Sequence, residues 1–188
     1  MADVISTNQF KNGMAIEVDG ESFTIVEFQH VKPGKGGAFV RTRLKSIATG
    51  NVLDRTFRAG EKFNRVHTQT RKMQYLYATE SEVVLMDGET FEQVSVPPAM
   101  AEAALKWVVE NMSVDLLYVD NRPFAVEPPT SVELEVVKAE PGLRGDTAQG
   151  GSKPVTLETG VTIQVPLFIE QGERIKVDTR SGQYLSRA

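Results

Sequence analysis

The feature that most constrains the fold is a series of short runs in which apolar and polar residues alternate, separated by tight turns. Residues 13–18 alternate and stop at Asp19-Gly20, and the pattern resumes over residues 22–29, 38–45 and 52–58. Alternation is typical of half-buried strands, and Asp-Gly is typical of a two-residue hairpin turn. We expect five short strands in about the first sixty residues, which indicates a small SH3-like barrel.

The middle of the chain contains one segment with helical periodicity, which begins after Pro97-Pro98 and runs over about residues 99–111. Apolar residues recur there at i, i+3, i+4 and i+7 and predict a buried face: Ala101, Ala104, Leu105, Val108 and Met112. The next segments, 113–119 and 124–126, again read as strands. A barrel with one helix between its strands is typical of an OB-fold. We interpret Trp107 as packing against a barrel rather than stacking on a nucleobase.

The last third predicts a second small barrel. Residues 132–136 alternate cleanly, and residues 161–165, 167–169 and 174–177 are further expected strands. Between them, Gly142–Pro154 contains four glycines and is expected to be an exposed loop.

The sequence therefore predicts an all-β protein of three small β-barrel domains, with one short helix in the middle domain. The expected boundaries are 1–64 for an SH3-like (KOW-type) N-terminal domain, 65–127 for a middle OB-fold and 128–188 for a C-terminal OB-fold. Pro128-Pro129 marks the second joint.

Lys35 stands at the centre of an unusual turn, Pro33-Gly34-Lys35-Gly36-Gly37, between two expected strands. Glycine tolerates positive φ and has no side chain to shield a neighbour, so the lysine is presented outward. From Phe28 to Lys45 there are five basic residues and no acidic one: Lys32, Lys35, Arg41, Arg43 and Lys45. Arg41, Arg43 and Lys45 share one strand face with Phe39 beside them. A cation on a basic hairpin suits an anionic partner, although an ordinary hairpin with an incidental lysine remains an alternative.

The net charge of −4 does not contradict an anionic partner, because the charge is unevenly distributed. Residues 1–64 carry 9 basic and 7 acidic side chains, whereas residues 65–127 carry 5 and 10. Salt screens charges beyond about 10 Å, so a local basic hairpin can act despite distant acidic residues.

Several kinds of chemistry lack their motifs in this sequence. There are no cysteines, which fits a reducing cytoplasm and excludes thiolate metal sites. Gly34-Lys35-Gly36 is followed by an expected strand and is not a phosphate-binding P-loop, and His30 and His67 lack metal-ligand spacing. A Schiff-base role for Lys35 would require a desolvated amine, and a loop tip flanked by glycines is the opposite environment. We expect no enzyme activity, metal or cofactor, no secretion signal and no membrane segment.

The order of these signals resembles the bacterial translation elongation factor P family over the whole chain. The resemblance rests on six segments in sequence order: Pro33–Arg41, Met73–Tyr77, Gly142–Thr147, Thr156–Gly160, Val165–Ile169 and Val177–Tyr184. It implies three β-barrel domains in an elongated L shape that resembles tRNA. It also implies that the protein binds the 70S ribosome next to the peptidyl-tRNA, between the P and E sites, and relieves stalling at consecutive prolines without being an enzyme.

The resemblance also implies roles for particular residues. Lys35 would contact the CCA end of the P-site tRNA and be the target of a lysine-modifying enzyme, with Pro33, Gly34, Gly36 and Gly37 as its scaffold. Lys32, Arg41, Arg43 and Lys45 are candidates for contacts to ribosomal or transfer RNA. The Gly145, Asp146 and Thr147 loop would lie near the E-site mRNA codon, and Tyr184 and Arg187 near the small subunit. The protein would act as a cytoplasmic monomer. The alternative hypothesis is a general single-stranded nucleic-acid-binding protein, which OB-folds also support.

Overall fold

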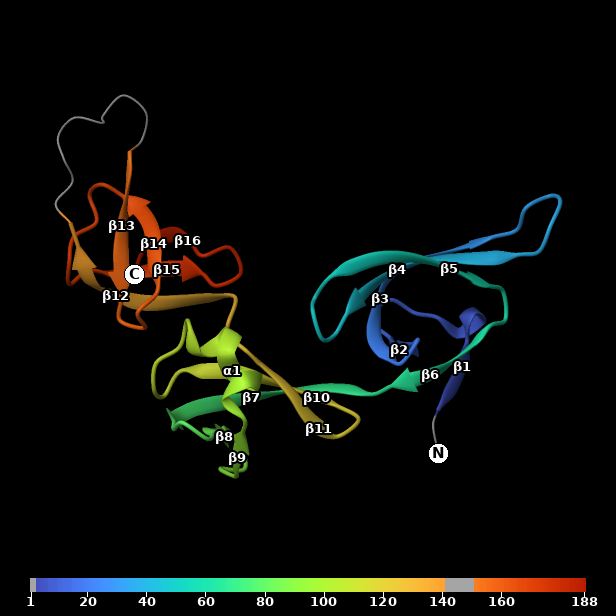
Figure 1. The fold of residues 1–188 in the computed structure, drawn as a ribbon, viewed down its shortest axis with the longest axis horizontal. Coiled ribbons are helices and arrows are strands. Elements are labelled where there is room, and N and C mark those ends of the chain that lie inside the picture. The colour runs from blue at the N-terminus through green and yellow to red at the C-terminus, as the bar shows by residue number, and fades with distance from the viewer. Residues whose placement is uncertain (1–2, 141–150) are drawn as a thin grey trace. The chain divides into compact units, whose positions relative to one another are not determined.

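The computed structural model describes residues 3–140 and 151–188 and folds them into three β-sheets (Figure 1). The predicted all-β class is confirmed, as is the single short α-helix in the middle of the described chain. By its internal contacts the chain divides into two compact units: Met1–Gln69 with Val119–Arg122, and Thr70–Tyr118 with Pro123–Ala188. Within the described ranges, no helix is long and apolar enough to cross a membrane.

The N-terminal sheet has six strands in the order β1-β6-β2-β3-β4-β5. Their bounds are β1 Val4–Ser6, β2 Ala15–Val18, β3 Glu21–Val31, β4 Phe39–Ser46, β5 Val52–Arg58 and β6 Lys62–Val66, with a 3-10 turn at Thr7–Gln9. The inward residues of these strands enclose one apolar cluster, in which Ile16, Ile25 and Leu44 are fully buried. The count is six strands rather than the five expected. β6 continues to Val66, which pairs with Ala15, past the expected boundary at residue 64.

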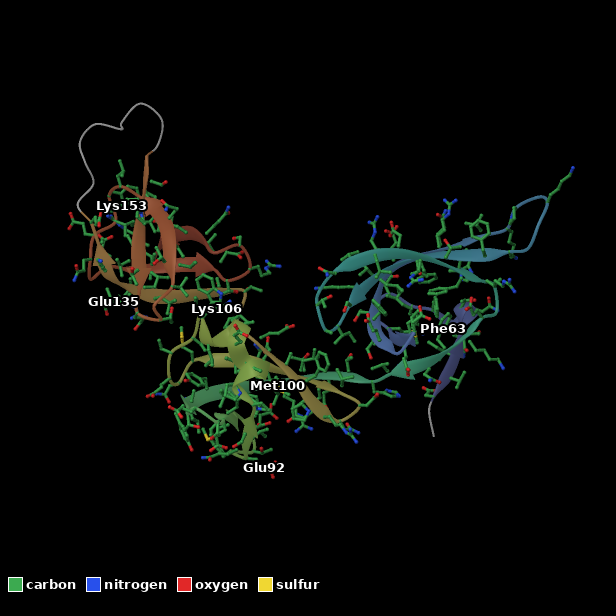
Figure 2. All side chains as sticks on the ribbon, viewed as in Figure 1. Phe63, Glu92, Met100, Lys106, Glu135 and Lys153 are labelled. Carbon is green, nitrogen blue, oxygen red and sulfur yellow. The ribbon has the colours of Figure 1, made fainter. Side chains whose placement is uncertain are left out.

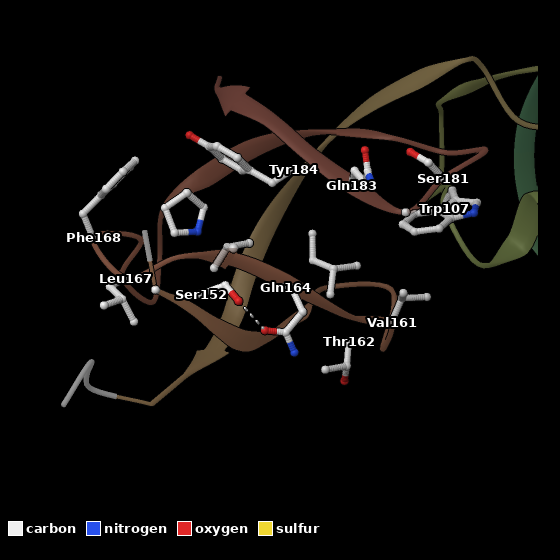
Figure 3. A pocket seen from close by; sticks show the side chains of 15 residues that line it. Trp107, Ser152, Val161, Thr162, Gln164, Leu167, Phe168, Ser181, Gln183 and Tyr184 are labelled. Carbon is white, nitrogen blue, oxygen red and sulfur yellow. Dashed lines mark hydrogen bonds between the residues drawn. The ribbon is translucent and has the colours of Figure 1, made fainter. Parts of the chain in front are cut away.

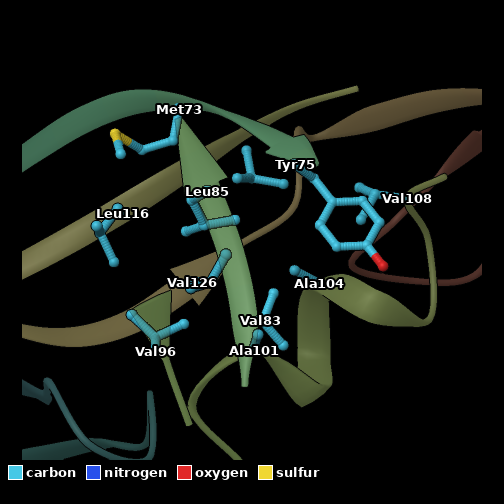
Figure 4. Packing of buried hydrophobic residues seen from close by; sticks show 11 residues of the cluster. Met73, Tyr75, Val83, Leu85, Val96, Ala101, Ala104, Val108, Leu116 and Val126 are labelled. Carbon is cyan, nitrogen blue, oxygen red and sulfur yellow. The ribbon is translucent and has the colours of Figure 1, made fainter. Parts of the chain in front are cut away.

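The middle sheet has the order β11-β10-β7-β8-β9. Its strands are β7 Thr68–Ala78, β8 Val83–Asp87, β9 Gln93–Val96, β10 Ser113–Val119 and β11 Arg122–Glu127, and the helix α1 spans Pro98–Leu105. Figure 4 shows α1 beside this core, with Ala101 and Ala104 near Val83 and Tyr75.

The predicted helix was too long. The structure ends α1 at Leu105, whereas the apolar periodicity extended it to Asn111. The backbone after the helix pairs with β7 instead: the Asn111 amide donates to the Tyr75 carbonyl at 2.7 Å, and the Tyr75 amide donates to the Met112 carbonyl at 2.9 Å. The predicted buried positions still pack on the core, because a compact turn satisfies nearly the same spacing.

The C-terminal sheet has the order β14-β13-β12-β15-β16. Its strands are β12 Ser131–Ala139, β13 Ser152–Leu157, β14 Thr162–Pro166, β15 Arg174–Asp178 and β16 Gln183–Arg187. Trp107 packs against the core of this sheet, as interpreted from the sequence. The expected strand over residues 167–169 is wrong: these residues turn, and the Ile169 amide donates to the Pro166 carbonyl at 3.2 Å.

Two aspartates cap turns that follow strands in the same way. The Asp87 carboxylate accepts hydrogen bonds from the amides of Thr90 and Glu89, at 3.0 and 2.8 Å. Asp178 makes the same contacts, at 3.0 and 2.8 Å, with the amides three and two residues further along the chain. Because these amides stabilise the charged form, they lower the pKa of both carboxyls below the ordinary aspartate value.

This geometry predicts a specific acid sensitivity. A carboxyl whose pKa is lowered by folding stabilises the fold above its ordinary pKa, and the contribution is lost as pH falls through the lowered value. We expect the Asp87→Asn and Asp178→Asn double variant to lose less stability than wild type between about pH 5 and pH 2, as measured by chemical denaturation. Glu102→Gln, an exposed change on α1, is the control and should follow the wild-type curve. Identical curves for all three proteins would contradict the assignment.

Candidate functional site

The hairpin of β3 and β4 extends beyond the rest of its sheet and carries the predicted loop (light blue in Figure 1). The two strands pair from Phe23 opposite Ser46 to Val31 opposite Phe39, with a bulge between Ile25 and Glu27. A bulge inserts one extra residue and reverses which side chains face the core. As a result Ile25 faces inward, whereas Glu27 faces outward.

The structure places Lys35 in a fully exposed loop, and residues 32–37 are all exposed. Gly36 has a φ of +110°, a conformation that side chains rarely adopt, so this position requires glycine. Gly34 and Gly37 have no such φ, and an added Cβ would meet nothing within 4 Å. These two glycines therefore leave the space around the lysine open rather than permit an unusual backbone.

Three cations line the outer face of β4, as the alternation predicted: Arg41, Arg43 and Lys45 are exposed, and the residues between them are buried. Their electrostatic situations differ. Arg43 is paired on both sides, to Asp54 of β5 at 3.2 Å and to Glu27 of β3 at 3.9 Å.

Arg41 lies between neutral neighbours, Gln29 on β3 and Thr56 on β5. Its guanidinium lies over the Phe39 ring at 5.6 Å from the centroid. Four cations of the hairpin form no salt bridge with a carboxylate within 4.0 Å among the described residues: Lys32, Lys35, Arg41 and Lys45. The hairpin thus keeps four uncompensated cations, and Arg43 is the one cation there whose charge is balanced internally.

The second group of predicted residues lies on β16, at a distance in sequence from the hairpin. A bulge between Lys176 and Val177 shifts the register, so that Tyr184 pairs opposite Val177 and Arg187 opposite Ile175. Val177 and Ile175 are both fully buried. Because directly paired residues share a face, the bulge places Tyr184 and Arg187 on one face although they are three positions apart.

Tyr184 lines a groove of about 1060 Å³ that runs along β14 and the start of β16. Figure 3 shows Trp107 at one end of this groove and Phe168 at the other. Gly182 lies beside the Trp107 ring, where a Cβ would be in ordinary contact at 3.6 Å from a ring atom, and its φ of +68° is a conformation that side chains rarely adopt.

Arg187 makes three contacts with the segment that connects β14 to β15. The guanidinium lies over the Phe168 ring at 4.9 Å, donates to the Phe168 carbonyl at 3.2 Å and pairs with Glu173 at 3.2 Å. Its position is therefore well defined, although its charge is partly compensated.

The remaining predicted residues, Gly145, Asp146 and Thr147, lie outside the described residues. Sequence reasoning also missed the partners Glu27 and Asp54, because the pairing depends on strand register. A period-two pattern on β5 could have placed Asp54 opposite β4, but the bulge that turns Glu27 outward leaves no sequence signal beyond Val26 interrupting the alternation.

Comparison with known protein families identifies the class of protein from its domains. Three family models match consecutive parts of the chain: the elongation factor P KOW-like domain over residues 6–63, the OB domain over 68–126 and the C-terminal domain over 132–187. These are the domains of a translation elongation factor.

Full-length relatives give the family. Elongation factor P of Moorella thermoacetica is 55% identical over 185 residues, which cover 98% of this chain and 100% of the relative. Elongation factor P of Caldanaerobacter subterraneus subsp. tengcongensis is 53% identical over 184 residues, with 98% and 100% coverage. The chain belongs to the elongation factor P family, as its resemblance predicted.

Proposed function

We propose that this translation elongation factor binds the ribosome next to the peptidyl-tRNA, between the P and E sites, and promotes peptide bond formation at consecutive prolines. The observation that carries the proposal is the exposed Lys35 at the end of a long hairpin whose other cations are largely uncompensated. The cations of such a hairpin can contact successive phosphates of an RNA backbone, while the Lys35 amine lies at the tip of the hairpin.

The proposed mechanism is positioning rather than chemical catalysis. Proline is a constrained nucleophile, and its ring restricts the path of the nascent chain. Holding the acceptor end of the tRNA in a reactive geometry removes part of the barrier without any acid, base or nucleophile from the factor. The ribosome would supply the chemistry, and Lys35 would reach the CCA end.

Lys35 is also the proposed site of a covalent extension by a separate modifying enzyme. An exposed lysine between glycines is accessible to such an enzyme, and the open space around Gly34 and Gly37 leaves room for a longer side chain. The intact mass of the protein from its native cells, with fragmentation of the Lys35 peptide, tests this directly. An unmodified mass would show that lysine itself is the reaching group.

At the other end of the chain, we propose that Tyr184 and Arg187 contact the small subunit and that Gly145, Asp146 and Thr147 lie near the E-site codon. The support is that Tyr184 and Arg187 share one face of β16 and that contacts with the segment between β14 and β15 hold the Arg187 guanidinium.

The different pairing of the two hairpin arginines gives a quantitative prediction. Arg41→Ala should weaken ribosome binding about three- to tenfold and lower the salt dependence of binding by about one counterion, because an uncompensated cation is lost. Arg43→Ala should affect binding less and instead reduce stability by about 1 kcal/mol or less, because its pairs with Glu27 and Asp54 are exposed. Binding titrations at several salt concentrations decide this, and equal losses for both variants would contradict it.

The whole proposal is tested in a reconstituted translation system with two reporters, one encoding consecutive prolines and one without them. We expect the protein to accelerate only the proline reporter. If it accelerates neither, and instead binds free single-stranded oligonucleotides as tightly as ribosomes, the general nucleic-acid-binding alternative replaces the proposal.

A further inference from the structure

The inner face of the β3–β4 hairpin ends in a row of three paired residues next to the loop. His30 on β3 lies opposite Val40 on β4, and Val40 lies opposite Phe57 on β5. Val40 is fully buried and Phe57 is 8% exposed, so this is the core-facing side of the sheet. The bulge after Ile25 is what turns His30 to this side, away from the outer face that carries the cations.

His30 is also the last ring in a series of aromatic contacts that begins in the core. Phe63, labelled in Figure 2, lies 4.6 Å from Phe57, and Phe57 lies 6.4 Å from Phe10. Phe10 meets Phe28 at 6.3 Å, and Phe28 meets His30 edge to face at 5.6 Å and 86°. These separations and angles are those of favourable aromatic pairs. The series joins the centre of the barrel to the residue just before the loop.

The loop itself contributes little to its own direction. Among the described residues, none of the backbone hydrogen bonds outside the strand ladders involves residues 32–37. The direction in which Lys35 points is therefore set by the ends of the two strands, where His30 and Val31 pair with Val40 and Phe39.

We propose that His30 is a positioning residue for Lys35, and that it acts as an aromatic ring rather than as a charge. By packing on Phe28 it fixes the end of β3 against the barrel core and so fixes the direction of the loop. This inference rests on the proposed function of Lys35. A role as a sixth cation of the hairpin toward RNA is disfavoured, because His30 faces the inner side of the hairpin whereas Arg41 and Lys45 face the outer side.

Three substitutions at this position separate the ring from the charge. His30→Ala removes the ring, His30→Phe keeps a ring without a charge, and His30→Lys keeps a charge without a ring. His67→Ala is the matched control, since His67 is the other histidine and is also exposed. Thermal unfolding of each protein verifies that it folds.

Two measurements are made on each variant of the full chain: the rate of translation of the consecutive-proline reporter at several factor concentrations, and the backbone order parameters of Lys35 and Gly36 by NMR relaxation. We expect His30→Ala and His30→Lys to lower the maximal rate about fivefold, with less than about a twofold change in the half-saturating concentration. The order parameters of both loop amides should fall in these variants. His30→Phe and His67→Ala should behave like wild type in both measurements.

Wild-type order parameters in His30→Ala would overturn the proposal, whatever the translation rate. So would full activity in His30→Lys together with reduced activity in His30→Phe, because that result assigns a role to the charge. If the proposed function of Lys35 is wrong, the results differ in the translation rates alone. Lys35→Ala and every His30 variant would then translate the consecutive-proline reporter at the wild-type rate, while the order parameters of the loop amides would still fall in His30→Ala.

Discussion

Replacing Lys35 by alanine should lower the translation rate of a consecutive-proline reporter by one to two orders of magnitude, to the rate without added factor. The same variant should not change the rate of a proline-free reporter. In the proposed mechanism, Lys35 is the one group of the hairpin that contacts the CCA end of the tRNA, whereas the other cations contribute only to binding RNA. The loss of a contact that positions the reacting groups lowers the reaction rate far more than the loss of one phosphate contact lowers the binding affinity.

Two matched variants sharpen this expectation. Lys32→Ala removes an exposed cation from the same loop and should cost only about three- to tenfold in ribosome affinity, with the maximal rate retained. Lys35→Arg keeps the charge but removes the amine that a modifying enzyme would extend. Full activity of Lys35→Arg would show that the charge suffices, and full activity of Lys35→Ala would contradict the role of Lys35 altogether.

Replacing Leu85 by alanine should destabilise the protein by about 2–5 kcal/mol. Leu85 is fully buried on β8 of the middle sheet, between β7 and β9, in the apolar core that also contains Ala101 and Ala104 of α1 (Figure 4). Its removal loses transfer free energy and leaves a cavity, because the flanking strands β7 and β9 and the rest of the core hold the neighbouring side chains in place. Chemical denaturation measures the loss.

Leu185→Ala is the matched control, since Leu185 is 50% exposed on β16. Surface changes of this kind usually stay within about 0.5 kcal/mol. If the two leucine variants lost equal stability, the packing of the middle core around Leu85 would be wrong.

The elements that the sequence predicted well are those in which alternation and turn chemistry agree. The expected strand over residues 52–58 matches β5, and the strand over 38–45 matches β4 to within one residue at each end. In both cases glycine-containing turns bound the run, and every second residue is buried in β4. The number of short strands and the position of the helix also indicated the barrel types, and the family segments implied the same ones.

The elements that were missed depend on partners distant in the sequence. β1 is three residues long and exists because Ile5 pairs with Phe63 of β6. β13 begins at Ser152, inside the segment expected to be an exposed loop, and its Val155 is buried. The helix ended early because β7 competes for the backbone of Asn111 and Met112. None of these partners can be read from a local window.

The features of the candidate site also fall into two groups, those that local pattern predicts and those that depend on residues distant in the sequence. The positions of Lys35, Arg41, Arg43 and Lys45 followed from the turn and the period-two pattern. Which of these cations is compensated, and which side His30 faces, depend on the bulge after Ile25 and on the register with β5. The sequence therefore located the basic hairpin, and the structure distinguished the roles within it.

The position proposed for Lys35 on the ribosome is tested most directly by replacing Lys35 with a photoreactive benzophenone amino acid and mapping its crosslinks on ribosomes stalled at consecutive prolines. The same replacement at Thr49, exposed in the turn between β4 and β5, is the control. Position 35 should crosslink to the 3′-terminal nucleotides of the P-site tRNA, and position 49 should not. Crosslinks from position 35 that avoid the tRNA acceptor end would contradict the position proposed for Lys35.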